Sequence, residues 1–108
     1  MGKYVVKIGS AASREIKKLD RRAQVQVIES LEAMQSDPRP KGIEKLSQNP
    51  RFYRLRFGDY RLIYNVDDKS STIYVVVVRH RRDAYRAIED LDAKLINALF
   101  APSFPTAP

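Results

Sequence analysis

Apolar and polar residues alternate along residues 53–66, a pattern that is typical of β-strands. The pair Gly58-Asp59 interrupts the alternation once and favours a two-residue hairpin turn, which places Arg56 opposite Arg61. One face of this hairpin then carries the apolar and aromatic residues Tyr53, Leu55, Phe57, Tyr60, Leu62, Tyr64 and Val66. The other face carries Arg54, Arg56 and Arg61. Like charges opposed across a ladder destabilise it by about 0.2–1 kcal/mol, a cost that a bound anion would offset.

A third strand is predicted at residues 72–81, where continuous β-branched residues favour a central position in the sheet. If Val66 pairs with Thr72, then Arg79 and Arg81 project from the same face as the hairpin arginines. Five arginines would share that face. A shift of one residue would turn both toward the core, where an unpaired charge costs far more.

Two helices and a further strand are predicted before the hairpin. Residues 3–8 alternate as a short strand at or near a sheet edge. Ser10 is a candidate N-cap for the first helix and Asp20 for the second, which the prolines of residues 37–40 terminate.

Helical spacing of apolar residues predicts a last helix over residues 84–100, and we expect residues 101–108 to form a disordered tail. The order predicts one α+β domain over residues 1–100: an N-terminal strand, a helical hairpin, a three-stranded antiparallel meander and a C-terminal helix. We expect the helices to pack on one face of a twisted four-stranded sheet. That face would be the aromatic one, which also takes in Tyr74, Val76 and Val78 of the last strand. The arginine face would stay open, with four apolar residues on it: Ile63, Ile73, Val75 and Val77.

Composition narrows the candidate chemistry. The chain has 20 Lys+Arg against 13 Asp+Glu in 108 residues, a net charge of +7 that favours a polyanionic partner. It has no cysteine, and His80 is its one histidine, so disulfides, thiolate nucleophiles and cysteine-ligated zinc are excluded. We therefore expect no metal and no other cofactor. The longest aliphatic run is too short to span a bilayer, and we expect a cytoplasmic location without a membrane partner.

Three stretches follow the predicted helical hairpin in a characteristic order. They are Lys45-Leu46, the hairpin YRLRFGDYRLIY at residues 53–64, and VVRHRRDAY at residues 77–85. In these stretches the chain resembles the RelE/ParE superfamily of toxins, and within it the RelE-like messenger RNA interferases. The resemblance implies a ribosome-dependent endoribonuclease that cleaves mRNA. It also implies a RelB-like cognate antitoxin, with which the toxin would form a hetero-oligomer.

The resemblance further implies the functional residues. The implied catalytic residues are Arg56, Arg61, Arg81 and Tyr85, and the implied RNA-binding residues are Lys45, Arg54, Arg79 and Arg82. Relatives carry lysines on the first hairpin strand where this chain has Arg54 and Arg56. A guanidinium does not readily give up its proton, so neither arginine inherits a lysine's acid–base role.

Cleavage of RNA suits such a cluster, because the substrate carries its own nucleophile, the 2′-hydroxyl. The protein must align the reacting groups and stabilise charge on the phosphate, which guanidinium groups do through paired hydrogen bonds. Tyr85 is interpreted as a proton-transfer group, a base-stacking residue or a core residue of the last helix. Two other functions stay open: a ParE-like inhibitor of DNA gyrase, and a nucleic-acid-binding module without catalysis.

Overall fold

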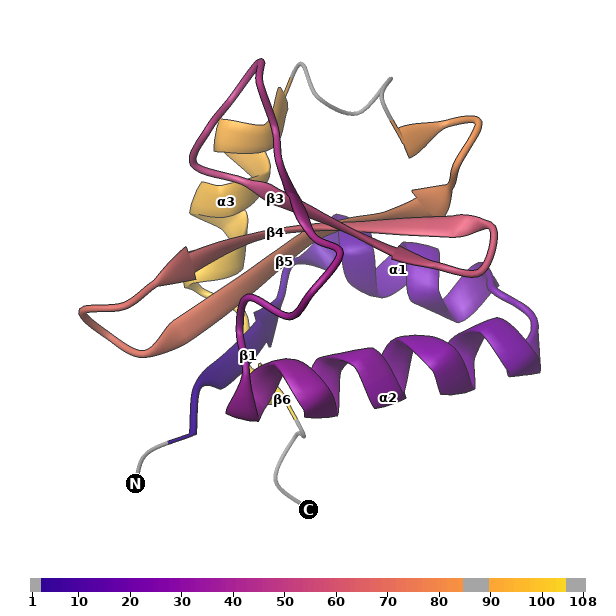
Figure 1. Ribbon diagram of the computed structural model, residues 1–108, viewed down its shortest axis with the longest axis horizontal. Helices are drawn as coiled ribbons and strands as arrows, with labels where there is room; N and C mark the ends of the chain where they lie inside the picture. The colour runs from indigo at the N-terminus through magenta and orange to yellow at the C-terminus, as the bar shows by residue number, and fades with distance from the viewer. Residues whose placement is uncertain (1–2, 85–89, 105–108) are drawn as a thin grey trace.

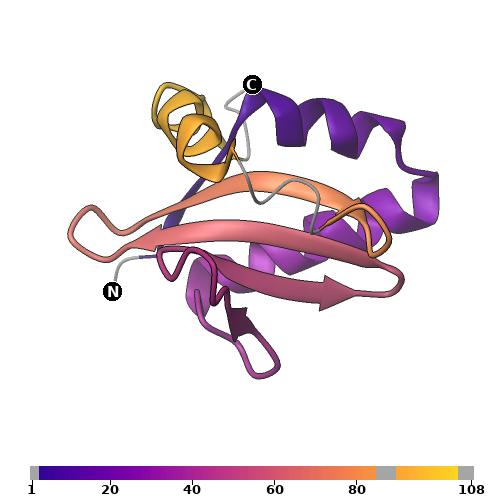
Figure 2. The same cartoon turned by 90° about the horizontal axis from the view of Figure 1, so that it is seen from above.

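The structure is a computed structural model and describes residues 3–84 and 90–104. Its strands form one six-stranded sheet in the order β2-β3-β4-β5-β1-β6, and not the expected four-stranded one, because β2 and β6 add a short strand at each edge. Figure 1 shows the arrangement and Figure 2 shows β3, β4 and β5 side by side from above. The strands are β1 (Val5–Ile8), β2 (Glu44–Lys45), β3 (Tyr53–Phe57), β4 (Tyr60–Asp67), β5 (Thr72–His80) and β6 (Ser103–Phe104). The helices are α1 (Ser10–Lys18), α2 (Arg21–Ser36) and α3 (Leu91–Leu99).

The predicted hairpin is confirmed, and its aromatic face forms the larger core. Arg56 pairs with Arg61 across β3 and β4. Gly58 adopts a φ of 55°, the left-handed conformation that a two-residue turn of this kind requires. Phe57, Leu62 and Tyr64 belong to the buried core cluster that also contains Val27, Leu31 and Met34 of α2, and the other four predicted apolar residues of the hairpin pack against it. The amphipathic pattern of α2 therefore docks the helix against the hairpin.

The pairing of β4 with β5 differs from the prediction. Val66 pairs with Ile73 instead of Thr72, and Val76 has no partner because the register shifts between Ile63 and Tyr64. Near the β4–β5 turn, the observed register differs from the predicted one by one residue. The bulge adds a second residue to β5, so the total difference beyond it is two residues and each side chain returns to its predicted face. Beyond the bulge, side chains regain the predicted faces, and Arg61 lies opposite Arg79.

The apolar assignments before the bulge are consequently wrong. Ile73 and Val75 belong to the core under α1 and α2, whereas Tyr74 and Val76 join a second cluster on the opposite face. Val78, beyond the bulge, lies in the first core as predicted.

The helices do not all cover one face of the sheet, which corrects a second expectation. In Figure 1, α1 and α2 lie below β3, β4 and β5, and α3 lies above them. Leu91 and Ala98 of α3 pack with Ile63 and Val77, which are both buried. The arginine face is therefore open only toward the β3–β4 turn, because α3 and the segment before β3 cover the remainder.

The termini of the helices are capped in two different ways. Asp20 caps α2 as predicted, since its carboxylate accepts a hydrogen bond from the backbone of Ala23 at 2.8 Å. Ser10 is not the cap of α1, which follows Gly9 without a side-chain cap. Instead, Asn97 of α3 accepts hydrogen bonds from the Ser10 backbone at 2.8 Å and from its hydroxyl at 3.0 Å. The last helix thus holds the start of the first.

The C-terminal part of the chain extends the sheet. α3 begins at Leu91, and the earlier portion of the predicted helix, residues 85–89, lies outside the described residues. Ser103 and Phe104 pair with Lys7 and Val6 as β6, so the expectation of disorder from residue 101 is wrong for these two residues. β1 therefore lies one strand in from the edge, as predicted. Among the described residues, no helix has the length and apolar character needed to cross a membrane.

Candidate nucleic-acid interface

Three arginines form a row across the open part of the arginine face. Arg56 of β3 lies opposite Arg61 of β4, which lies opposite Arg79 of β5. Residues that oppose each other in an antiparallel ladder project from the same face. The sequence predicted the first pair, and the bulge in β5 produces the second.

Arg61 occupies the electrostatic centre of this surface. Its pKa is lowered, first by partial burial and then by repulsion from Arg56, Arg54 and Arg81, while Asp59 acts in the opposite direction. Its guanidinium donates a hydrogen bond to the backbone oxygen of Tyr60 at 3.0 Å. A bound anion would offset the repulsion between Arg61 and its neighbouring arginines, so this position favours a phosphate.

The turn after β5 brings Arg81 to the same surface. The backbone N–H of Arg81 donates to the carbonyl of Asp59 at 2.8 Å, which ties the end of β5 to the β3–β4 turn. The backbone N–H of Arg82 donates to Nδ1 of His80 at 3.2 Å, and the Arg82 side chain is exposed. His80 also packs edge-on against Tyr60. It therefore lies on the opposite face from Arg79, as the alternation predicts.

The two outer arginines of the face are held by carboxylates. Arg54 pairs with Glu44 of β2 at 3.2 Å. Arg79 donates from Nε to Glu15 of α1. In the described part of the chain, Arg56, Arg61 and Arg81 have no such ion pair. The structure thus divides the five arginines into a central group of three and two neutralised flanks.

Two other expected site residues are not brought into this group. Lys45 pairs with Tyr53, so it projects from the opposite face to Arg54, and its ammonium lies 6.0 Å from the centre of the Tyr53 ring. Tyr85 lies outside the described residues. No three His, Cys, Asp or Glu side chains gather as a metal site within residues 3–84 and 90–104.

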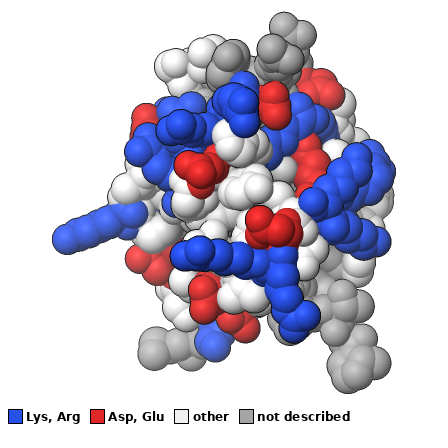
Figure 3. Space-filling view, turned by 90° about the vertical axis from the view of Figure 1, so that its right-hand side faces the viewer, with Lys and Arg blue, Asp and Glu red and all other residues white. Residues whose placement is uncertain are grey.

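Charge gathers visibly at the end of the molecule that carries the β3–β4 turn. Figure 3 views the molecule from this side and shows Lys and Arg concentrated over its upper part, with Asp and Glu among them.

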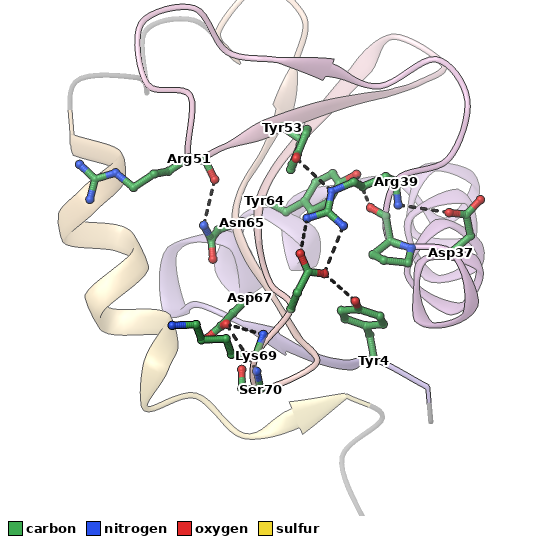
Figure 4. Close-up of polar contacts among 12 residues, drawn as sticks. Tyr4, Asp37, Arg39, Arg51, Tyr53, Tyr64, Asn65, Asp67, Lys69 and Ser70 are labelled. Atoms are coloured by element: carbon green, nitrogen blue, oxygen red, sulfur yellow. Dashed lines mark hydrogen bonds and ion pairs between the residues drawn. The ribbon is translucent and has the colours of Figure 1, made fainter. Parts of the chain in front are cut away.

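A second arginine centre lies at the other end of the hairpin, and Figure 4 shows it in detail. Arg39 binds both carboxylate oxygens of Asp68, at 2.8 and 3.2 Å, and donates from Nε to the hydroxyl of Tyr53 at 3.0 Å. Tyr4 donates to the same carboxylate at 2.6 Å. The hydrogen bond from Arg39, followed by that from Tyr4, lowers the pKa of Asp68. This network joins four segments and has a structural role.

Sequence reasoning missed Glu15, Glu44 and Arg39. Glu44 precedes Lys45 in a stretch without a clear strand pattern, and its cross-strand position follows only once β2 is recognised. Glu15 stands in a basic helix, and nothing in its local pattern indicates a partner 64 residues away. Arg39 lies in the proline-rich break, where a helix stop was the only signal.

Comparisons with known proteins identify the family of this chain. A family model described as the ParE toxin of type II toxin–antitoxin systems matches residues 6–85. Toxin RelG of Mycobacterium tuberculosis is 31% identical over 84 residues, which cover 77% of this chain and 97% of RelG. Matches of this extent define the class of protein, a toxin of a type II toxin–antitoxin system. The chain belongs to the RelE/ParE toxin superfamily.

Solved structures of such toxins have the same fold. The toxin–antitoxin complex RelBE2 from Mycobacterium tuberculosis contains a chain with 28% identity and a TM-score of 0.65, over 73% of this chain and 99% of that one. The archaeal RelE–RelB complex from Pyrococcus horikoshii gives 27% identity and a TM-score of 0.66, over 73% and 96% of the two chains.

Proposed function

We propose that this toxin is a ribosome-dependent endoribonuclease that cleaves mRNA and thereby inhibits translation. The observation that carries the proposal is the environment of Arg61, a partly buried guanidinium repelled by three other arginines. Such a site gains most from an anion with several oxygens, which a phosphodiester supplies. The RelE and RelG names of the similar proteins support the same activity.

The proposed chemistry uses the 2′-hydroxyl of the substrate as nucleophile against the adjacent phosphate. Arg56, Arg61 and Arg81 would bind the phosphate oxygens and stabilise the negative charge that develops in the transition state. The attacking hydroxyl loses a proton and the departing 5′ oxygen gains one, which leaves 2′,3′-cyclic phosphate and 5′-hydroxyl ends. Guanidinium groups do not carry these protons, so Tyr85 is the proposed proton-transfer or stacking residue.

The proposal includes a partner and a location. Several of the similar structures are complexes of RelE-type toxins with RelB antitoxins. We propose a RelB-like cognate antitoxin for this chain, bound in a toxin–antitoxin hetero-oligomer. The proposed substrate, mRNA on ribosomes, places the toxin in the cytoplasm.

A second candidate is inhibition of DNA gyrase. The observation in its favour is the matching family model, which is described as a ParE toxin. A third candidate, a binding module without catalysis, would use the same arginines to hold phosphates. Gyrase inhibition has no evident need for a repelled arginine at the centre of the surface, whereas the binding module differs from the nuclease only in the absence of cleavage.

Expression of the toxin followed by primer extension on a translated message tests the three candidates. Endoribonuclease activity predicts cleavage sites in translated regions only, with cyclic phosphate ends and no effect of EDTA on the reaction with intact ribosomes. Unbroken messages together with trapped gyrase–DNA complexes would favour the second candidate. RNA binding without cleavage on ribosomes would favour the third.

A further inference from the structure

The arginine row does not end at β5, because α1 adds a carboxylate to it. Arg56, Arg61 and Arg79 follow one another across three strands, and Glu15 binds Arg79 beyond the last strand. The row therefore consists of three arginines with one glutamate at its end. Arg79 lies directly opposite Arg61 on β5, so it is the arginine of the row that Glu15 can neutralise.

Glu15 is fixed by a second contact, which it makes with the backbone of β5. β1 pairs with β5 only as far as Val75, so within residues 3–84 and 90–104 no strand lies along the edge of β5 beyond that residue. The backbone N–H of Val78 on this edge donates to Oε1 of Glu15 at 2.9 Å, while Oε2 binds Arg79. α1 thus substitutes one carboxylate for the missing strand, and both oxygens have defined partners.

The burial of this pair distinguishes it from the ion pairs elsewhere on the described surface. The Glu15 side chain is 18% exposed, whereas Glu44, the partner of Arg54, is 58% exposed. A charge-assisted hydrogen bond in a partly buried site is less screened by salt and water than an exposed pair. A phosphate would therefore displace Glu44 more readily than Glu15.

We propose that Glu15 is a positioning residue that withholds Arg79 from RNA and limits the phosphate-binding surface to Arg56, Arg61 and Arg81. The inference rests on the proposed function and revises one expectation within it, since Arg79 was an expected RNA contact. Glu15 acts on the substrate only through Arg79. The RNA phosphate therefore binds on the part of the arginine face near the β3–β4 turn, and the surface over Arg79 of β5 does not take part.

Glu15→Gln tests the proposal because glutamine still accepts a hydrogen bond from Val78 but carries no charge. The freed Arg79 adds one phosphate contact, so the plot of log affinity against log salt steepens by about 0.7 for a single-stranded ligand. The same relation gives a gain in affinity of about fivefold at roughly 0.1 M salt. The probe is a fluorescein-labelled 2′-O-methyl oligouridine, which binds but cannot be cleaved, followed by fluorescence anisotropy.

The double variant Glu15→Gln/Arg79→Gln has the net charge of the wild type and no arginine to release. Its salt slope should return to the wild-type value. A steep slope that persists in the double variant, or an unchanged slope in Glu15→Gln, would overturn the proposal. Circular dichroism melting of each variant shows that the comparison is made on folded protein.

Glu32→Gln is the matched charge control. Glu32 is exposed on α2, on the other side of the sheet, and has no ion pair within the described part of the chain. The variant changes net charge by the same amount as Glu15→Gln, so the inference requires its salt slope to match the wild type. An equal steepening in Glu32→Gln would show a general charge effect and contradict the role of Arg79.

Failure of the proposed function gives a different result from failure of this inference. If the surface does not bind RNA phosphates, Arg61→Ala binds the oligouridine as well as the wild type. If the surface binds RNA but Glu15 does not withhold Arg79, Arg61→Ala loses affinity while Glu15→Gln leaves the slope unchanged.

Discussion

Arg39 and Arg61 lie at opposite ends of one β-hairpin and differ in almost every physical respect. Arg39 has a bidentate carboxylate, a phenol and an aromatic face as partners, and hydrogen bonds to Asp68 and Tyr53 raise its pKa. Arg61 has other arginines around it, and its pKa is lowered. An arginine therefore stabilises the fold at one end of the hairpin, whereas at the other end repulsion between arginines destabilises it.

The contrast shows how a small sheet separates structure from function. At the Arg39 end, every charge that joins the network already has a partner within the chain. At the Arg61 end, the repulsion is offset only by a ligand, which is typical of a surface selected for binding. Comparing alanine variants of Arg61 and Arg39 is therefore the most direct way to test the proposed function.

The largest expected effect is on cleavage by Arg61→Ala. Loss of a preorganised charge donor at the phosphate commonly lowers the rate by about two to three powers of ten. Single-turnover cleavage of mRNA on saturating ribosomes measures it. Arg39→Ala is the matched control and should keep the wild-type rate. A normal rate in Arg61→Ala would place the phosphate elsewhere.

Arg39→Ala should instead lower the melting temperature by a few degrees. The variant leaves Asp68 with Tyr4 alone and removes the cation that packs on Tyr53. Thermal unfolding followed by circular dichroism provides the measurement. Arg51→Ala removes a single exposed pair, 3.6 Å from Asp92, and should change the melting temperature less. Equal losses in both would argue against a network.

The contribution of Asp68 should depend on pH with a defined sign. Its folded-state pKa is lowered, so the carboxylate stabilises the fold fully above the unfolded value of about 3.9. This contribution is lost as the pH falls through the folded-state pKa. The melting temperatures of wild type and Asp68→Asn should therefore differ at neutral pH and converge in acid. A difference that grows in acid would contradict the sign.

The smallest expected effect is a stabilisation by Arg56→Ala. The change removes one of two like charges that oppose each other across β3 and β4, a repulsion worth about 0.2–1 kcal/mol. Urea unfolding should show a slightly higher midpoint, even though RNA binding weakens. A lower midpoint would mean that Arg56 has a stabilising contact that outweighs the repulsion.

Local patterns predicted the parts of the fold that local interactions determine. The turn at Gly58-Asp59 leaves one register for β3 and β4, so the Arg56–Arg61 pair follows from the sequence. The Asp20 cap likewise depends on residues three positions apart. Both are set within a single element or turn, where the chain offers few alternatives.

The parts that depend on distant contacts were not predictable in this way. The bulge at Val76 leaves no mark in a run of valines, because every register keeps the strand apolar. The side on which α3 packs depends on burial of Ile63 and Val77, which the sequence placed on the arginine face without indicating that a helix would cover them. The Glu15–Arg79 pair requires α1 to lie along the edge of β5, and only the complete fold shows this.

The position of β1 in the sheet has a consequence for synthesis of the toxin. Its partners are residues 72–75 of β5 and the two residues of β6, so they are made long after β1 itself. Asn97, which holds the start of α1, is also translated long after that helix. A nascent chain that ends before β5 has an unpaired N-terminal strand and lacks both Arg79 and Arg81. Long-range closure of this kind makes assembly of the sheet a late step.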